Sequence, residues 1–398
     1  MFRPRTQKSL NEPSPYELHR SLPNPSLKAK PGRRQRFQPP PEPPKKPRKL
    51  RKTLISLLVF LAVISAGYGA WVGWKFVDNA AHIFGWRGLF SLFWPSHLKG
   101  EDTGRVNILL AGNSADDPGH EGANLTDSIM LISINTKNDT AYMLSIPRDL
   151  YVNIPGNGYA KINEAYQDGN EQHFSQVGYP AGGMGLLEET VSQKFGVQID
   201  YYALIDYSAL KDAVNAVGGI TVDIQSNDPR GLYDPSIDYA TNGPLVNLTN
   251  GEHTLNGEQA LDLARARGDA YGSYGFPLAD FNRTQHQRQM LIALKDRTTS
   301  ASVFANPIRM GELFDALGKH VQTDIPLGGV RRLYDFSNKI PNSKVQSAAL
   351  NSATVNGQKD VDLLRSYLTS YGQDALIPAA GIDNYTQIDD YIQQLNGQ

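Results

Sequence analysis

The strongest constraint on this chain is an uncharged, mostly apolar run, TLISLLVFLAVISAGYGAWVGW, at residues 53–74. As a helix, this run is long enough to cross the hydrocarbon core of a bilayer, which takes about 20 residues. A helix also satisfies its own backbone hydrogen bonds, which lipid cannot do for it. Residues 53–74 therefore predict one transmembrane helix, with a cleaved signal peptide as the alternative.

Charge is divided unequally between the two sides of this run. Residues 1–52 hold 15 of the 39 basic residues and 3 of the 40 acidic ones, which leaves 24 basic and 37 acidic residues after them. Basic flanks stay in the cytoplasm, so we expect the chain after Trp74 to lie outside the cell. The acidic outer part argues against a nucleic-acid partner. The absence of Cys excludes disulfides, thiolate catalysis and Cys-bound metals.

Composition divides the rest of the chain into further segments. Residues 1–52 are rich in Pro and in basic side chains, which predicts a disordered cytoplasmic tail. Residues 75–104 carry many aromatic side chains and predict a juxtamembrane linker at the membrane interface. Residues 105–350 predict the folded domain. Residues 351–398 are more polar and predict a C-terminal extension, either an extra subdomain or a loosely packed tail.

Strand-like and helix-like segments alternate through the folded part. Aliphatic runs bounded by Gly, Asn or Pro predict strands at 106–112, 128–135, 140–147, 201–207, 220–224 and 345–350. Helical patterns occur near 186–195, 209–217, 257–267, 281–297, 309–319, 327–339, 360–371 and 387–395. The alternation predicts an α/β fold, a layered α-β-α domain with a central mixed sheet, preceded by the transmembrane helix and the disordered basic tail.

Arginine recurs where the predicted strands end and the predicted helices begin. Pro147 ends a strand and places Arg148 in a loop at the sheet edge, where α/β proteins usually bind ligands. Arg283 and Gln287 are four residues apart, on one face of a predicted helix. Converging guanidinium groups can clamp phosphate, because their planar fork matches its oxygens. Taken alone, each arginine is more often a solvated or ion-paired surface residue.

Arg265 and Arg267 form a further candidate pair. On an ideal helix they would point about 200° apart. Both can therefore reach one ligand only if the chain leaves the helix at this point. The alternative is that they pair with nearby carboxylates, namely those of Glu258, Asp262 or Asp269.

Acidic residues before the second predicted strand are the candidates for metal binding. Asp127 lies directly before that strand, and the polar loop 113–121 precedes it in the chain. Carboxylates of this loop and His120 could complete a metal site with Asp127, or Asp127 could simply form a turn. The sequence has no zinc-ligand spacing, no Walker motif and no Gly-x-Ser-x-Gly motif.

In order along the chain, these segments resemble the LytR-CpsA-Psr family of membrane-anchored envelope proteins. The matching motifs span residues 106–290 and are NILLAG, LTDSIMLISIN, SIPRDLYVNIPG, KINEAY, DYYALIDYSALKDAVNAVGGITVDI, LNGEQALDLARAR and DFNRTQHQRQ. The resemblance implies a phosphotransferase that moves a glycan phosphate from a polyprenyl-pyrophosphate carrier onto peptidoglycan and releases polyprenyl phosphate. It also implies a single-pass cell-membrane protein with a cytoplasmic N-terminus and an extracytoplasmic catalytic domain.

The resemblance further implies a role for each candidate residue. Six residues match the pyrophosphate binders: Arg148, Lys161, Arg265, Arg267, Arg283 and Gln287. Asp127 matches a Mg²⁺-linked aspartate, and Asp280 matches an acidic position that orients or deprotonates the acceptor hydroxyl. With these roles, the catalytic set is Asp127, Arg148, Arg283 and Asp280. Such a site performs phosphoryl transfer by spreading cations over the developing charge, and Mg²⁺ suits it because it bridges carboxylate and phosphate.

This chain departs from the family's pattern at several positions. Ser114 stands where an aspartate is usual, Leu125 where an arginine is usual, and His286 where another arginine is usual. An insertion rich in Gly and Tyr covers residues 268–279. The missing carboxylate weakens the expected Mg²⁺ site unless a neighbouring residue replaces it. The candidates for that replacement are Asp116, Asp117 and His120.

Two other functions stay open on the sequence alone. The chain could be a non-catalytic membrane regulator of envelope biogenesis that binds polyprenyl-phosphate lipids, which the changes at Ser114 and Leu125 favour. It could also be a pyrophosphohydrolase on the same lipid, with water as the acceptor. In each case the lipid tail needs an apolar slot between the sheet and the helices, and the sequence does not assign its lining.

Overall fold

The computed structural model describes residues 95–116, 124–238, 243–300, 309, 312–313 and 318–397, which all belong to the unit Leu61–Gln398. The predicted tail, the predicted transmembrane helix and residues 75–94 of the predicted linker lie outside these described residues. Among the described residues, no helix is both long enough and apolar enough to cross a membrane.

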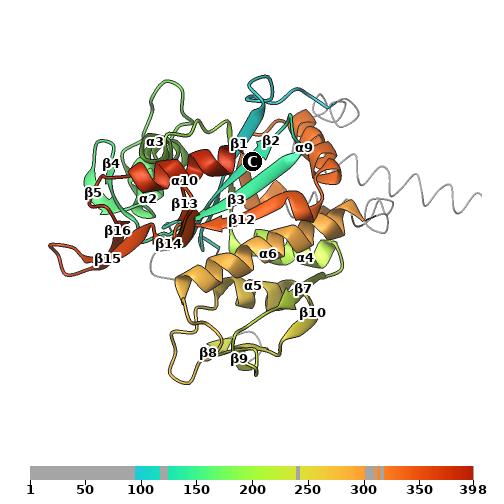
Figure 1. Ribbon diagram of the computed structural model, residues 1–398. Helices are drawn as coiled ribbons and strands as arrows, with labels where there is room; N and C mark the ends of the chain where they lie inside the picture. Colours follow the sequence, from blue (N-terminus) through green and yellow to red (C-terminus); the bar gives the residue numbers. More distant parts are fainter. Residues whose placement is uncertain are drawn as a thin grey trace, which may run out of the picture. The chain divides into compact units, whose positions relative to one another are not determined.

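Six strands form the central sheet (Figure 1). In spatial order they are β11 (Val321–Thr323), β6 (Tyr201–Ile205), β1 (Arg105–Gly112), β2 (Ser128–Asn135), β3 (Thr140–Ile146) and β12 (Val345–Ala349). Strand β2 runs antiparallel to both β1 and β3, whereas β6 is parallel to β1 and β12 is parallel to β3. The sheet is therefore mixed, which confirms the prediction of an α/β fold with a central mixed sheet.

Five two-stranded ladders accompany this sheet in the described part of the chain. They are β4 (Tyr151–Ile154) with β5 (Gly158–Lys161), β7 (Ile220–Ile224) with β10 (Gly251–Leu255), β8 (Leu232–Asp238) with β9 (Gly243–Leu248), β13 (Ser352–Val355) with β14 (Gln358–Asp362), and β15 (Leu364–Leu368) with β16 (Asp374–Pro378). The strand predicted at 220–224 forms, but it joins one of these ladders rather than the sheet. Its partner β10 is distant in the sequence, and a local pattern does not reveal such a partner.

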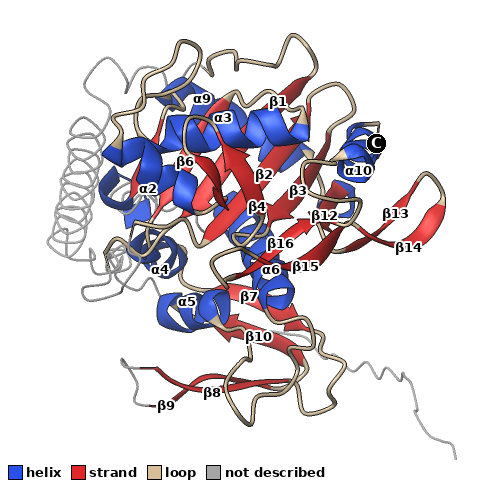
Figure 2. Ribbon diagram, turned by 90° about the vertical axis from the view of Figure 1, so that its left-hand side faces the viewer, coloured by secondary structure: helices blue, strands red, loops and turns tan. Residues whose placement is uncertain are grey.

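Helices pack on both faces of the central sheet (Figure 2). They are α2 (Glu164–Glu171), α3 (Gly183–Phe195), α4 (Tyr207–Ala216), α5 (Gly257–Arg265), α6 (Asp280–Thr299), α9 (Leu327–Lys339), the 3₁₀ helix η1 (Asn342–Lys344) and α10 (Thr386–Asn396). Leu109 of β1 packs in one core with Leu187 of α3 and Ile392 of α10. Its neighbour Ile108 packs in another core with Phe336 of α9, since successive side chains of a strand point to opposite faces.

A third core joins α4, α5 and α6 to the ladders β7–β10 and β8–β9. Val214, Ile220, Leu232, Leu263 and Met290 all belong to it. Helix α5 begins with a capping box, in which the Asn256 side chain accepts from the Gln259 backbone N–H and the Gln259 side chain accepts from the Asn256 backbone N–H. This local signal fixes the start of α5, and the third core holds the three helices beside the sheet.

The helix predicted at residues 360–371 is wrong, because β14 and β15 cover most of this stretch. Leu364, Tyr367 and Leu368 have helical spacing, but Leu364 is buried whereas Leu368 is 64% exposed. Antiparallel pairing of Leu364 with Pro378 and of Leu368 with Asp374 satisfies the backbone instead. The helix predicted at 309–319 lies mostly outside the described residues.

Residues after Asn351 contribute to the main core. Val355, Leu363, Ile388 and Leu395 are buried in the same cluster as the strands of the central sheet. The expected boundary between the domain and its C-terminal extension therefore does not coincide with a break in packing.

Candidate active site

One edge of the central sheet brings four strand ends together. Strand β1 ends at Gly112, which pairs with Ser128 at the start of β2 and with Ile205 at the end of β6. At the same edge, Ile146 at the end of β3 pairs with Ile129 of β2. The loops that adjoin these ends therefore gather here, and they carry several of the predicted site residues.

A cavity of about 290 Å³ opens at this edge, between the sheet and helices α4, α5 and α6. Six of the predicted site residues line it: Asp127, Arg148, Arg265, Arg267, Arg283 and Gln287. The other two, Lys161 and Asp280, are connected to this lining by ion pairs. The structure thus brings residues from four separated stretches of sequence into one pocket.

Asp127 and Arg148 pair on the sheet side of the cavity. The Arg148 guanidinium donates from Nη1 to Asp127 Oδ1, and its Nε lies 3.7 Å from Asp149 Oδ2. Lys161 Nζ donates to Asp149 Oδ1 at 2.7 Å, so Asp149 lies between Lys161 and Arg148 and contacts both. Burial alone would lower the pKa of Arg148, but the charges of Asp127, Asp149 and Asp280 raise it above its ordinary value.

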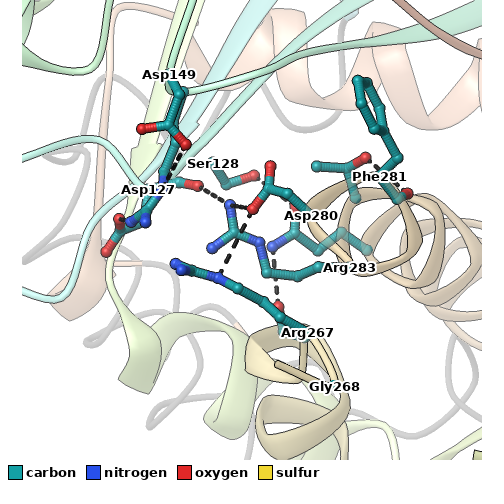
Figure 3. Close-up of polar contacts among 12 residues, drawn as sticks. Asp127, Ser128, Asp149, Arg267, Gly268, Asp280, Phe281 and Arg283 are labelled. Carbon is teal, nitrogen blue, oxygen red and sulfur yellow. Dashed lines mark hydrogen bonds and ion pairs between the residues drawn. The ribbon is translucent and has the colours of Figure 1, made fainter. Parts of the chain in front are cut away.

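Asp280 pairs with two arginines on the helix side of the cavity (Figure 3). Its Oδ1 lies 2.8 Å from Arg283 Nη2 and 3.7 Å from Arg267 Nε. Arg283 also donates from Nη2 to the backbone carbonyl of Asp127 at 2.8 Å. Burial lowers the pKa of Arg283, and the nearby carboxylate of Asp280 opposes that shift.

Arg283 carries a buried donor that is not satisfied by any described residue. Its side chain is only 4% exposed, and its Nε has no hydrogen-bond partner among the described residues. An unmet N–H in so buried a group is destabilising by about 1–3 kcal/mol.

Arg265 and Arg267 both reach the cavity because the helix ends between them. Helix α5 ends at Arg265, and Ala266 has extended backbone angles of φ −62° and ψ 129°. The condition set by the sequence, that the chain must leave the helix here, is confirmed. Arg265 stacks over the ring of Tyr207 at 5.2 Å, whereas Arg267 pairs with Asp280.

Gln287 links the sheet to the helices. Ser128 Oγ donates to Gln287 Oε1 at 2.8 Å, and Gln287 Nε2 donates to the backbone carbonyl of Ala264 at 3.0 Å. Both ends of this amide are thus engaged within the protein.

The other part of the cavity lining is apolar. It consists of Leu110, Met130, Ile205, Leu210, Leu245, Leu261, Met290 and Leu291. Two members of this lining, Met290 and Leu291, continue along helix α6 from Arg283 and Gln287. The contributions of α4 and α5 could not be read from sequence. The cavity lining therefore combines cationic side chains with an apolar part.

Comparison with known proteins identifies the family. The model of the LytR_cpsA_psr family matches residues 92–375. This chain belongs to the LytR_cpsA_psr family. A relative from Oceanobacillus iheyensis, named polyisoprenyl-teichoic acid–peptidoglycan teichoic acid transferase TagU, is 32% identical over 278 residues, which cover 68% of this chain and 77% of the relative.

Solved structures of LytR_cpsA_psr proteins are similar in fold. "TagT bound to LI-WTA" has a TM-score of 0.53 and 26% identity, over 75% of this chain and 92% of that chain. "LytR-CPS2A-psr family protein YwtF (TagT) with bound octaprenyl pyrophosphate lipid" has a TM-score of 0.50 and 25% identity, over 74% and 91% of the two chains.

Two of the departures from the LytR_cpsA_psr pattern have a structural explanation. The ring of His286 packs edge-on against Phe276 of the insertion at 5.7 Å, and it does not line the cavity. Burial lowers the pKa of His286 to about 4, which makes it a neutral packing residue. Ser114 is fully buried and shares a hydrogen bond with Tyr207, which lines the cavity.

One described group of side chains in this LytR_cpsA_psr chain has metal-ligand spacing. Donor atoms of Asp116, Asp206 and His320 lie within 4.8 Å of one another. Asp116 accepts backbone N–H groups of Tyr207 and Ser208, and Asp206 caps α4 and contacts His320 Nδ1 at 2.9 Å. These contacts make the group part of the α4 N-terminus. Asp117 and His120 lie outside the described residues.

Proposed function

We propose that this chain is a phosphotransferase that moves a glycan phosphate from a polyprenyl-pyrophosphate carrier onto peptidoglycan and releases polyprenyl phosphate. The observation that carries the proposal is the cavity, which joins converging arginines to an apolar lining. A diphosphate attached to an isoprenoid chain has the same two-part chemistry. The printed names of the relatives, a teichoic acid transferase and a protein with bound octaprenyl pyrophosphate, support the same assignment.

The cationic end would hold the diphosphate. Arg148, Arg265, Arg267 and Arg283 all line it, and each planar guanidinium can bind two phosphate oxygens at once. Lys161 would support this end through Asp149 rather than by direct contact. The apolar end, between α4, α5 and α6, would receive the first isoprenoid units, whose transfer from water is favourable by about 25 cal/mol per Å².

The reaction exchanges one phosphorus–oxygen bond for another. The acceptor hydroxyl oxygen bonds to the phosphorus that carries the glycan, and the bond from that phosphorus to the bridging oxygen breaks. Polyprenyl phosphate leaves with the electron pair, and Asp280 takes the hydroxyl proton. The arginines stabilise the charge on the transferring and leaving groups, which are already ionic, so the protein needs no covalent step.

Mg²⁺ is the proposed cofactor, and Asp127 is its proposed ligand. Asp127 lines the cavity, but its carboxylate also contacts Arg148. Of the other lining carboxylates, Asp206 caps α4, and Asp234 accepts the backbone N–H groups of Ser236 and Gly268. A fourth lining carboxylate, Asp269, has neither of these roles. Mg²⁺ fits a site with few protein carboxylates, because it commonly takes its remaining ligands from substrate phosphates and water. Such an ion would neutralise charge on the diphosphate.

We also propose the membrane topology that the sequence predicts. Residues 53–74 would span the membrane once, residues 1–52 would stay in the cytoplasm as a disordered basic tail, and the α-β-α domain would face outward. A transfer driven by the diphosphate bond of its own substrate requires no cytosolic ATP. Digestion of intact cells with an external protease tests this topology: cleavage after residue 104 supports it, and complete protection of that part contradicts it.

The test of function is turnover by the full-length chain in detergent. The chain is incubated with a short polyprenyl-pyrophosphate glycan, Mg²⁺ and peptidoglycan strands, and all products are measured. Glycan joined to the wall polymer supports the transferase. Tight binding without product supports the regulator, and free sugar phosphate supports the hydrolase.

A pair of arginine variants makes this test specific to the cavity. Arg283→Ala removes a buried member of the proposed clamp, whereas Arg331→Ala removes a half-exposed arginine that pairs with Asp335 along helix α9. We expect turnover to be lost in the first variant and kept in the second. Equal rates in folded Arg283→Ala protein would overturn the clamp.

A further inference from the structure

Three tyrosine rings form a continuous row on two neighbouring hairpins, β4–β5 and β15–β16. The rings of Tyr151 and Tyr159 stack with centroids 5.7 Å apart, and the ring of Tyr367 is tilted against Tyr151 with its centroid also 5.7 Å away. The two hairpins lie side by side because Leu150 pairs with Leu376 (Figure 1). We call Tyr151, Tyr159 and Tyr367 the tyrosine row.

The middle ring of the row, Tyr151, lies close to the cationic residues of the cavity. Tyr151 pairs across the β4–β5 ladder with Lys161. Lys161 binds Asp149 at 2.7 Å, and Asp149 Oδ2 lies 3.7 Å from Arg148 Nε. The middle ring of the row is therefore separated from the proposed diphosphate clamp by a single lysine–aspartate pair.

The row leads away from the cavity onto an accessible surface. Tyr159 is 44% exposed, and beyond Tyr367 the β15–β16 hairpin presents Leu368 and Tyr371, which are 64% and 85% exposed. The Tyr159 hydroxyl contacts Asp383, whose charge is paired with Lys194 at 3.2 Å. Lys161 and Lys194 beside this surface are each paired with an aspartate, so their charges are not available to anionic lipid headgroups.

We propose that the tyrosine row binds sugar rings of the acceptor polysaccharide. This inference rests on the proposed function and adds the binding site of the acceptor strand. The C–H face of a pyranose ring packs against an aromatic face, and the tyrosine hydroxyls can hydrogen-bond the sugar hydroxyls. A row of rings therefore suits a strand of linked sugars.

The geometry of phosphoryl transfer favours this side of the site for the acceptor. The attacking and leaving oxygens lie roughly in line on opposite sides of the phosphorus. The leaving polyprenyl phosphate is directed toward the apolar lining formed by Leu210, Leu261 and Met290. The acceptor must then approach from the opposite side of the diphosphate. Asp149 and Lys161, which connect Arg148 to the tyrosine row, do not belong to that lining.

The test compares row variants of the full-length chain with a matched control. The double variant Tyr159→Ala with Tyr367→Ala removes two rings, and Tyr159→Phe with Tyr367→Phe keeps them. Tyr271→Ala removes a fully exposed tyrosine in the insertion, outside the row. The measurements are the KM for peptidoglycan strands, the KM for the lipid-linked glycan, kcat, and direct binding of a soluble tetrasaccharide of N-acetylated amino sugars.

We expect the double alanine variant to raise the acceptor KM and weaken tetrasaccharide binding by about tenfold, or about 1.4 kcal/mol, because two aromatic contacts are lost. The donor KM and kcat at saturating acceptor should stay unchanged, and the Phe variants should keep most of the binding. Circular dichroism verifies the fold of each variant. Unchanged tetrasaccharide binding by a folded double variant overturns the proposal, as does an equal loss in Tyr271→Ala. Absence of product from the wild-type chain counts against the proposed function, while tetrasaccharide binding still tests the row.

Discussion

Glu188 of helix α3 carries a buried carboxyl group, and burial destabilises its ionised form in the native state. It is 4% exposed, and its Oε1 has no hydrogen-bond partner among the described residues. Burial, with the added repulsion of Asp324, raises its pKa from 4.5 to about 8, and Lys99 opposes the shift only in part. The native state therefore keeps this proton over a pH range in which the unfolded chain has released it.

The shift determines both the sign and the size of a stability effect. Below pH 4.5 both states are protonated and Glu188 contributes no pH dependence. As the pH rises toward 8, the unfolded state gains from ionisation and the folded state does not. The free energy of unfolding then falls by about 1.4 kcal/mol per pH unit, or roughly 5 kcal/mol in all. Glu188→Gln should remove this loss, because glutamine does not titrate.

The assay is urea unfolding of the full-length chain and of Glu188→Gln, followed by far-UV circular dichroism at pH 5 and pH 8. We expect the variant to gain stability relative to the wild type as the pH rises, by several kcal/mol between the two conditions. Glu171→Gln, at an exposed glutamate on α2, should show no such gain. A difference between wild type and Glu188→Gln that is the same at both pH values would refute the reasoning.

Three further predictions concern the cavity and its surroundings. Asp280→Asn should lower kcat by about 10²–10⁴, the usual contribution of a general base, while Asp280→Glu should recover part of it; an unaffected kcat would remove Asp280 from the mechanism. Chelation of Mg²⁺ and Asp127→Ala should each reduce turnover, and full activity under both conditions would remove the metal. His286, whose pKa falls to about 4, should destabilise the native state by about 3 kcal/mol as the pH drops from 6.5 to 4, because only the unfolded chain then takes up the proton. Acid unfolding of His286→Gln should lack this loss.

Local sequence patterns predicted five of the six strands of the central sheet, because their signals are local, and missed the three-residue edge strand β11. β1, β2 and β3 are short aliphatic runs bounded by Gly, Asn or Pro, and each forms within one or two residues of its predicted bounds. The same kind of pattern failed at residues 360–371. There the spacing of Leu364 and Leu368 is compatible with a helix. The segment forms strand β15 instead because it pairs with β16, which lies later in the chain.

The polar lining of the cavity was predictable where its residues lie at the ends of strands and helices. Arg148 follows a strand and Arg283 begins a helix, so topology alone brings them to the same edge. The apolar part was not predictable, because Leu210, Leu261 and Met290 look like ordinary core residues of three helices. Their common direction depends on how α4, α5 and α6 pack, which no single segment reveals.

Pairing of each buried arginine with an aspartate explains how this site stays stable before its ligand binds. The same pairs can then open to bind the ligand. Asp127 and Asp280 hold Arg148 and Arg283 in place, since a buried guanidinium without an anion would be strongly destabilising. A bound diphosphate offers oxygens to the same N–H donors, and it competes with the carboxylates for them. Asp280 would then lose part of its ion pair with Arg283 and become a better proton acceptor when the acceptor hydroxyl arrives. On this argument Asp280 first positions the arginines and then serves as the base, so its removal should impair both diphosphate binding and proton transfer.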